Sequence, residues 1–312
     1  MTRPAYVPPS KEGFIPFNIP SVGRQCFTRY QLYGELGNGP VMIGLHGGPA
    51  AGIFPEMSVF WPQDNIPVIL YDQIGCGEST RLPEKHKDES FWQMSLFLSE
   101  LDNLIDHLRL RDGPGFHLVG TSYGAMIAAD YATTRPRGLR GLVLCSPFAS
   151  RKLLDDGHRL RRKELPLGAQ EALTRGDETG DSQSAEYRKA LLAYHKNTMC
   201  RLDPWPAGWD ELFDECYKNP VFQVIAGPGP TTLGLGSFRD WNVVPRLHRI
   251  TATTLVINGE FDTAWERAVS PFFDLIPRVR WITYANASHG VMMETPAAEK
   301  LVGEFLKQIA TI

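Results

Sequence analysis

Short hydrophobic runs alternate with amphipathic stretches along the first half of the chain. After a Pro-rich leader, residues 24–33 have the β-branched and aromatic content of a strand, and apolar runs bounded by turn residues follow at 41–45, 68–71, 116–119 and 142–145. Runs that are apolar on both faces are typical of interior strands of a parallel sheet. Residues 91–110 place apolar side chains at helical spacing, and residues 125–133 predict a further helix. The alternation predicts a layered α/β fold with a mostly parallel sheet.

The middle of the chain interrupts this alternation. Residues from about 148 to 240 contain no convincing strand but carry dense charge and helix-like stretches, notably 185–199 and 207–217. Strands are then expected at 254–257 and 279–284, with a helix from about Trp265 between them and an amphipathic helix at 296–309. We therefore predict a first core segment at 1–148, a helical cap at 149–241 inserted after the sixth strand, and a second core segment at 242–312.

Composition and charge exclude several classes of protein. Of the 312 residues, 43% are hydrophobic and 21% are charged, values typical of soluble globular chains. The net charge of −3 gives no field that would favour nucleic acid or anionic lipid. The basic cluster at 159–163 is flanked by Asp155, Asp156 and Glu164, and we interpret it as a solvated helix face. We expect a small-molecule or short-peptide substrate and neither a nucleic-acid nor a membrane partner; the sequence does not specify an oligomeric state.

Cysteine usage and the N-terminal residues indicate a compartment. The five cysteines are odd in number and scattered, without C-x-x-C spacing, so we predict neither a disulfide framework nor a metal site. The first residues lack the apolar segment of a secretion signal, and no apolar run approaches the roughly 18 residues of a membrane span. We therefore expect a cytoplasmic protein.

A Gly-x-Ser-x-Gly motif, Gly120-Thr121-Ser122-Tyr123-Gly124, follows the apolar run at 116–119 and precedes the predicted helix at 125–133. A sharp strand-to-helix turn of this kind exposes the serine hydroxyl at the carboxyl edge of the strand. Glycines flank the serine because a Cβ atom there would collide with neighbouring backbone. This context predicts Ser122 as a nucleophile.

A serine nucleophile needs a general base, and the base needs a carboxylate that orients it. His289 and Asp262 lie in the loops that follow the last two predicted strands, and they come after Ser122 in the order acid, then histidine. That chain order is the one used by α/β-hydrolases. Glu260 is a rival acid but lies closer to the strand end. We predict a triad of Ser122, Asp262 and His289.

The tetrahedral intermediate of such a reaction needs two backbone N–H donors. One is expected from Tyr123, the residue after the nucleophile, and the other from Gly48 or Gly47 in the loop that follows the first apolar run. We place His46, which begins that loop, at the substrate site as a hydrogen-bonding residue and not as a base. The Gly-rich turn at 72–79 lacks a phosphate-binding pattern and is interpreted as scaffold.

Several sequence strings occur in an order that resembles the proline iminopeptidase family of α/β-hydrolases. They are HGGPA (46–50), YDQIGCGES (71–79), GTSYGA (120–125), CRLDPWP (200–206), RDWN (239–242) and INGEFD (257–262). The resemblance covers nearly the whole chain from about residue 24. It implies an α/β-hydrolase core, a helical cap over the active site and the triad named above. It also implies cleavage of an N-terminal proline or other residue, or of an amino-acid amide, without a cofactor.

The chain departs from this family where aminopeptidases bind the ammonium group of their substrate. In those members one carboxylate lies in a cap motif similar to GPSEF or GPNEF, and another directly follows the triad aspartate. Here the cap motif reads GPGPT, with Pro230 at the glutamate position, and Thr263 follows Asp262. Glu211 and Glu215 of a predicted cap helix are candidate replacements. The resemblance thus implies an intact triad beside an altered amine-binding site.

Three functions remain open from the sequence. The first is a serine hydrolase resembling proline iminopeptidase that cleaves a small amide or ester through an acyl-enzyme on Ser122. The second is a re-purposed enzyme of specialised metabolism that hydrolyses, transfers or cyclises an acyl group. The third is a non-catalytic ligand-binding protein, which would have no need of the complete triad. Fold alone does not decide among them.

Overall fold

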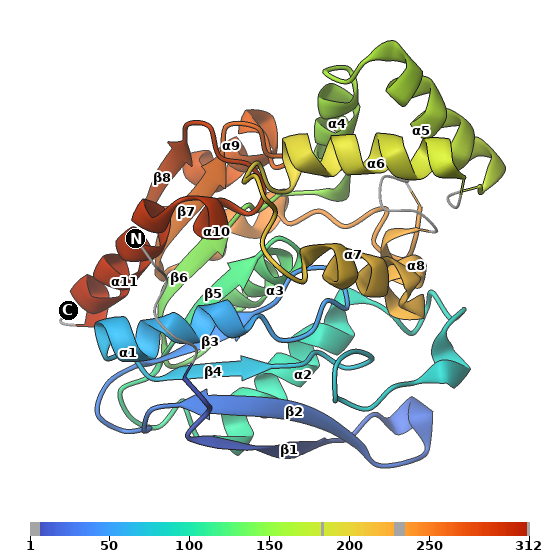
Figure 1. Cartoon of the computed structure of the whole chain (residues 1–312). Coiled ribbons are helices and arrows are strands. Elements are labelled where there is room, and N and C mark those ends of the chain that lie inside the picture. Colours follow the sequence, from blue (N-terminus) through green and yellow to red (C-terminus); the bar gives the residue numbers. More distant parts are fainter. Residues whose placement is uncertain (1–6, 182–183, 228–234, 311–312) are drawn as a thin grey trace.

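The computed structural model describes residues 7–181, 184–227 and 235–310, and in these ranges eight strands form one sheet (Figure 1). The order across the sheet is β1-β2-β4-β3-β5-β6-β7-β8. In this order, every neighbouring pair from β4 across to β8 is parallel. At the other edge, β1 pairs antiparallel with β2, and β2 pairs antiparallel with β4. Their bounds are β1 Lys11–Phe17, β2 Cys26–Tyr33, β3 Val41–Leu45, β4 Val68–Tyr71, β5 Phe116–Thr121, β6 Leu139–Cys145, β7 Thr253–Gly259 and β8 Val279–Tyr284.

Helices cover both faces of the sheet. Residues of α2, α3 and α9 belong to one buried cluster, and residues of α1 and α11 belong to another on the opposite face. The core helices are α1 Phe60–Asp64, α2 Met94–His107, α3 Tyr123–Ala132, α9 Glu266–Leu275, α10 Val291–Glu294 and α11 Pro296–Ala310. None of the helices in the described ranges has the length and apolar character needed to cross a membrane.

The remaining helices follow β6, as predicted. They are α4 Arg151–Arg162, α5 Leu167–Thr179, α6 Ala185–Thr198, α7 Trp209–Lys218 and α8 Pro220–Ala226, and they lie together on one side of the core (Figure 1). We call these helices and their connections the cap. Its two ends meet, because Arg151 N–H donates to Trp241 O at 3.0 Å and Val243 N–H donates to Ala149 O at 3.0 Å. The predicted fold class, a mostly parallel α/β core with helices inserted after the sixth strand, is confirmed.

The N-terminal strand β1 corrects the sequence prediction, which treated this part as a leader. Its burial alternates at Ile15 and Phe17, but Gly13 and Pro16 hide that period in the sequence. An edge strand tolerates both residue types because one side of its backbone needs no partner strand.

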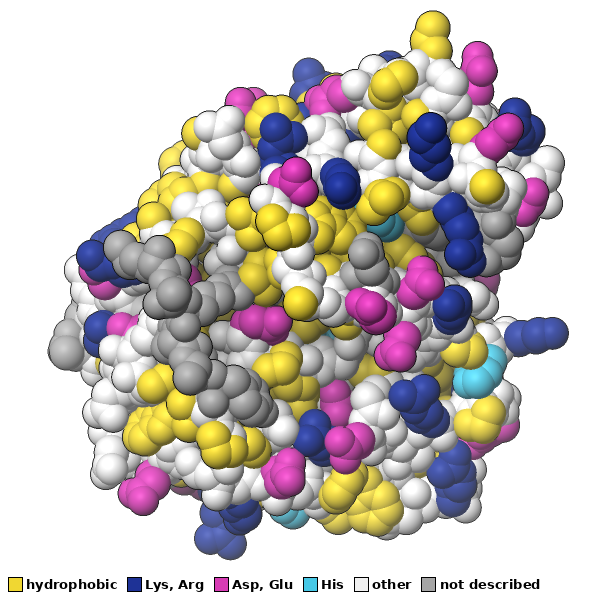
Figure 2. Space-filling view, in the orientation of Figure 1, with side chains coloured by type: hydrophobic (Ala, Val, Ile, Leu, Met, Phe, Trp, Pro, Cys, Tyr) yellow, Lys and Arg dark blue, Asp and Glu magenta, His cyan; other side chains and the backbone are white. Residues whose placement is uncertain are grey.

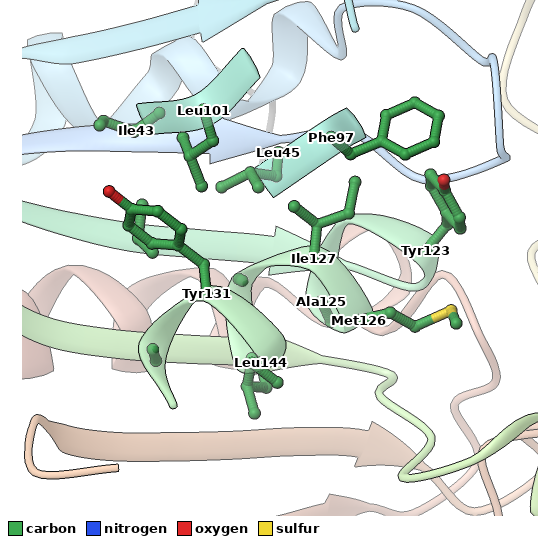
Figure 3. Close-up of a cluster of buried hydrophobic side chains, with 14 of the residues drawn as sticks. Ile43, Leu45, Phe97, Leu101, Tyr123, Ala125, Met126, Ile127, Tyr131 and Leu144 are labelled. Atoms are coloured by element: carbon green, nitrogen blue, oxygen red, sulfur yellow. The ribbon is translucent and has the colours of Figure 1, made fainter. Parts of the chain in front are cut away.

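Helix α3 begins directly after Ser122 and holds the turn that carries this residue in place. All ten of its residues are buried. Figure 3 shows Ile127 and Tyr131 of α3 beside Leu45 of β3 and Leu101 of α2. A helix surrounded in this way cannot shift without losing apolar burial worth about 25 cal/mol per Å², so the turn before it is held rigidly.

Candidate active site

Ser122 sits in the turn between β5 and α3 with a strained backbone, φ 55° and ψ −117°. Its N–H donates to Cys145 O at 2.9 Å. The flanking glycines are required by close backbone approach: a Cβ at Gly120 would lie 2.4 Å from Gly124 O, and a Cβ at Gly124 would lie 2.2 Å from Leu45 O. Strain of this kind persists only where the surroundings over-determine the conformation, and it is typical of a nucleophile elbow.

The predicted base and acid are in direct contact. His289 Nδ1 lies 2.6 Å from Asp262 Oδ1, and the Asp262 side chain is fully buried. Burial alone would lower the pKa of His289, but the neighbouring Asp262 carboxylate outweighs it and raises that pKa. Burial alone would raise the pKa of Asp262, but His289 and the Ala264 N–H, which donates at 2.8 Å, lower it. The arrangement keeps Asp262 ionised and places the proton of neutral His289 on Nδ1, which leaves Nε2 able to accept a proton.

The rival acid, Glu260, has a different partner. Its Oε2 accepts a hydrogen bond from the N–H of Asn286 at 2.9 Å. No contact joins its carboxylate to the His289 ring among the hydrogen bonds of the described residues. The geometry therefore favours Asp262 as the orienting acid.

The predicted oxyanion donors flank Ser122. A Cβ at Gly47 would lie 3.3 Å from Ser122 Cβ, so the loop after β3 passes close to the serine. Gly48 has φ 116°, a left-handed conformation that favours glycine. Tyr123 is the first residue of α3, where a backbone N–H has no acceptor within its own helix. Gly48, Tyr123 and Ser122 line the same cavity, and donation of the two N–H groups to an oxyanion beside Ser122 stays a prediction.

His46 is buried beneath this loop and is not part of the cavity lining, in contrast to its predicted place at the substrate site. Its Nε2 accepts from Gln73 N–H at 3.1 Å, so Nδ1 carries the proton and donates to Gly47 O at 2.8 Å. Burial lowers the pKa of His46, which favours this neutral form. Because the C=O and N–H of a trans peptide point in opposite directions, the bond to Gly47 O also fixes the direction of Gly48 N–H.

Ser122 and His289 line one cavity of about 250 Å³ between the cap and the core. Hydrophobic side chains gather where the cap helices meet the core in Figure 2. The apolar lining comes from both parts and includes Phe54, Met57, Phe60, Met126, Phe148, Leu154, Met199, Trp209, Leu212, Phe213, Phe222, Ile225 and Phe238. Such a lining suits an apolar portion of a substrate.

An arginine and a histidine of the cap in this lining were not anticipated from the sequence. Arg151 is buried and its Nε donates to Asp155 Oδ1 at 2.7 Å. His158 Nδ1 lies 2.6 Å from the Tyr194 hydroxyl, and burial lowers the pKa of His158 to about 3, so its imidazole is neutral. The spacing 151, 155 and 158 places these side chains on one helix face, which is the signal that the sequence offered.

The residues predicted to bind an ammonium group are dispersed. Thr263 is buried and lines the cavity, but Glu211 and Glu215 are exposed on α7 and do not line it. Pro230 lies outside the described residues. Within the described ranges the cap contributes no carboxylate to the lining; the two present, Glu56 and Glu299, come from the core.

Comparison with known proteins places these features in a family. A family model described as the alpha/beta hydrolase fold matches residues 40–296. A proline iminopeptidase of Heyndrickxia coagulans is 31% identical over 300 residues, covering 96% of this chain and 99% of the relative. The crystal structure of VinJ superposes with a TM-score of 0.87 at 35% identity, covering 97% of this chain and 100% of that one. The crystal structure of proline iminopeptidase from Mycobacterium smegmatis gives 0.84 at 29% identity, covering 96% and 99%.

Proposed function

This chain belongs to the alpha/beta hydrolase family and is a serine hydrolase similar to proline iminopeptidase, and from that premise we propose that its reaction runs through an acyl-enzyme on Ser122. His289 Nε2 takes the proton of the Ser122 hydroxyl as the oxygen attacks the substrate carbonyl. Asp262 stabilises the imidazolium that forms. The observation that carries this proposal is the 2.6 Å contact between His289 Nδ1 and Asp262 Oδ1 in a cavity that Ser122 also lines.

The later steps use the same groups. The N–H groups of Gly48 and Tyr123 donate to the negatively charged oxygen of the tetrahedral intermediate. His289 then gives its proton to the leaving amine or alcohol, and the carbonyl of the acyl-enzyme re-forms. Water, deprotonated by His289, attacks that carbonyl, and collapse of the second intermediate releases the acid and returns the proton to Ser122.

We infer a substrate with a sizeable apolar acyl group and no free ammonium beside the scissile bond. The cavity lining is mostly apolar, and among the described residues its cap side includes a neutral imidazole, His158, and the paired Arg151 but no carboxylate. Removing one partner from a buried ion pair typically costs about 3–5 kcal/mol. At about 1.4 kcal/mol per tenfold change, a substrate that buries a free ammonium group here without a carboxylate partner should lose roughly 10²-fold or more in kcat/KM.

The nucleophile is tested with a fluorophosphonate probe. We expect mass addition at Ser122 in the wild type, no addition at that position in Ser122→Ala, and turnover on the order of 10³-fold lower in the variant because only binding and oxyanion donors remain. Retention of most activity by Ser122→Ala would exclude the covalent mechanism. A ligand-binding protein without catalysis would show neither labelling nor turnover.

The substrate class is tested by comparing a prolyl arylamide that has a free N-terminus with its N-acetylated form and with a neutral ester of similar size. We expect the free amine to be the poorest substrate. Thr263→Glu should shift the preference toward the free amine, because it restores a carboxylate directly after Asp262. Efficient wild-type cleavage of the free amine, lost in Glu56→Gln or Glu299→Gln, would instead assign the ammonium group to these core carboxylates.

The apolar lining also favours the alternative of specialised metabolism, in which the acyl group is transferred or cyclised and not hydrolysed. Both outcomes share the acyl-enzyme and differ only in the nucleophile that ends it. Product analysis by mass spectrometry, with amine or alcohol acceptors added to the reaction, separates them. A dominant acceptor adduct would show transfer, whereas free acid alone would show hydrolysis.

A further inference from the structure

The loop that carries Asp262 is bound by a cap arginine. Arg161 Nε donates to Asp262 O at 2.9 Å, and its Nη2 donates to Glu260 O. These two carbonyls are two residues apart, and one side of the guanidinium serves both. The sequence interpretation of 159–163 as a solvated helix face is therefore wrong for Arg161, which is only 8% exposed.

The surroundings of Arg161 hold the guanidinium in this position. Its Nη1 donates to Glu164 Oε1 at 2.7 Å, and its charge lies 5.8 Å from the centre of the Phe261 ring. Two N–H groups in a fixed planar fork can bind both carbonyls at once, which a lysine ammonium on a flexible stem cannot do in the same geometry. Arg159, two residues earlier on α4, pairs with Asp156 at 2.8 Å and is exposed.

Helix α4 also packs directly against the loop. A Cβ at Gly157 would lie 2.0 Å from Thr263 O, so the helix backbone lies against the residue that follows Asp262. The other side of the loop is bound to the core, where Phe261 N–H donates to Ala287 O at 2.9 Å. We call residues 260–263 the acid loop. This loop is thus held between α4 of the cap and the segment that leads to His289.

We propose that Arg161 is a positioning residue that holds the carbonyls of the acid loop so that the Asp262 carboxylate stays directed at His289 Nδ1. The role of the triad in this statement rests on the proposed function. The residue acts through Asp262 and does not touch the reacting atoms. In this proposal, His289 is correctly oriented only while α4 of the cap packs against the acid loop of the core.

A change at Arg161 should be visible at His289. The carboxylates that raise the pKa of His289 are Asp262 in the acid loop and Glu294 in α10, and the neutral His158 of α4 also faces it. If the loop relaxes, the attraction between Asp262 and His289 weakens and the pKa of His289 falls. Loss of the Arg161 charge by itself would act in the opposite direction and raise that pKa. The sign of the change therefore distinguishes positioning from a simple charge effect.

The test is an NMR titration of the His289 imidazole in wild type, Arg161→Met, Arg161→Lys and the control Arg159→Met, with His289→Gln for assignment. We expect a lower pKa of His289 in both Arg161 variants and no change in Arg159→Met. Inactivation by the fluorophosphonate should be about tenfold or more slower in the Arg161 variants, since small misplacements of catalytic groups have effects of this size.

An unchanged or higher pKa of His289 in folded Arg161→Lys would overturn the proposal, and this variant decides if Arg161→Met does not fold. The titration reads the imidazole directly and does not depend on turnover. Absence of labelling at Ser122 in the wild type would instead refute the acyl-enzyme, so the two failures are distinct.

Discussion

At the scale of single residues, the contact between His289 and Asp262 sets the pH range in which the predicted base is neutral. The Asp262 carboxylate raises the pKa of His289 above its ordinary value of 6.5. Because only the neutral imidazole accepts the Ser122 proton, activity should be lost as pH falls through this raised pKa.

Asp262→Asn should therefore move the acid limb of kcat/KM to lower pH and also reduce the maximal rate by about 10⁴-fold. The limb moves down because the amide carries no charge to stabilise the imidazolium, and the rate falls because the amide favours the wrong tautomer. The measurement is kcat/KM from pH 4 to 9. Glu260→Gln is the matched control and should leave the limb in place; the reverse result would reassign the acid.

At the scale of elements, the joint between β5 and α3 depends on a glycine that no side chain can replace. A Cβ at Gly124 would meet the carbonyl oxygen at the end of β3 at 2.2 Å, and α3 is buried along its length. We expect Gly124→Ala to destabilise the protein by about 1–3 kcal/mol, as overpacking of a core does. Denaturant midpoints measure the effect.

Gly168 supplies the comparison for that variant. It lies in α5, is exposed, and a Cβ there would meet no heavy atom within 4 Å. Gly168→Ala should stabilise the protein by up to about 1 kcal/mol, because alanine loses less backbone freedom on folding. Equal effects at the two positions would show that the joint after β5 tolerates a side chain.

Helix α2 contributes a buried carboxyl group that responds to pH. Glu100 accepts hydrogen bonds from the Thr28 hydroxyl at 2.6 Å and from Ile74 N–H at 2.9 Å. Burial raises the pKa of Glu100 from 4.5 to about 8. Between these values the native state holds a proton that the unfolded state has released, so the free energy of unfolding should fall as pH rises.

Glu100→Gln should remove this part of the pH dependence, because an amide cannot ionise. The experiment compares denaturant midpoints of wild type and variant at pH 5 and pH 8. The wild type should lose more stability than the variant over that interval, even if the variant is less stable at pH 5 through an imperfect hydrogen bond to Ile74 N–H. A parallel loss in both proteins would contradict the assignment.

At the scale of the whole molecule, the cavity exists only because the cap packs on the core. Leu212 of α7 lines it, whereas Leu202, in the connection before α7, is exposed and does not. Leu212→Trp should lower kcat/KM for a p-nitrophenyl ester of a long acyl chain by about tenfold or more relative to the acetate ester, since methylene-sized changes in such pockets are worth about 1–3 kcal/mol.

Leu202→Trp is the control for bulk and should leave the ratio of long-chain to acetate kcat/KM unchanged. If Leu212→Trp lowered kcat/KM equally for the long-chain ester and the acetate ester, the cavity would not hold the acyl chain. The cap also binds the loop of the base, since His289 N–H donates to Thr198 O and Gly290 N–H to Met199 O, at 2.9 and 2.8 Å. Cavity and triad are thus assembled by the same packing.

Local pattern in the sequence was sufficient for the core strands other than β1 and for the chain order of the predicted triad. The Gly-x-Ser-x-Gly motif between a strand and a helix specifies the turn at Ser122, since Gly120 must leave room for the Gly124 carbonyl four residues later, whereas Gly124 leaves room for Leu45 O of β3. Parallel strands bring their carboxyl ends to one edge, which places Asp262 and His289 near that serine. The helices expected at 125–133, 185–199 and 296–309 agree closely with α3, α6 and α11, because helical periodicity is a local property.

The tertiary structure alone decided which polar side chains of the cap face inward. Helices α4 and α7 both carry charged and polar side chains. Those of Arg151, His158 and Arg161 in α4 are buried, whereas those of Glu211 and Glu215 in α7 are exposed. Composition cannot separate them, because the face of a helix that becomes buried depends on contacts with segments about 100 residues distant, such as the acid loop that Arg161 binds. Edge strand β1 escaped detection for a related reason: its pairing with β2, and not its own pattern, makes it a strand.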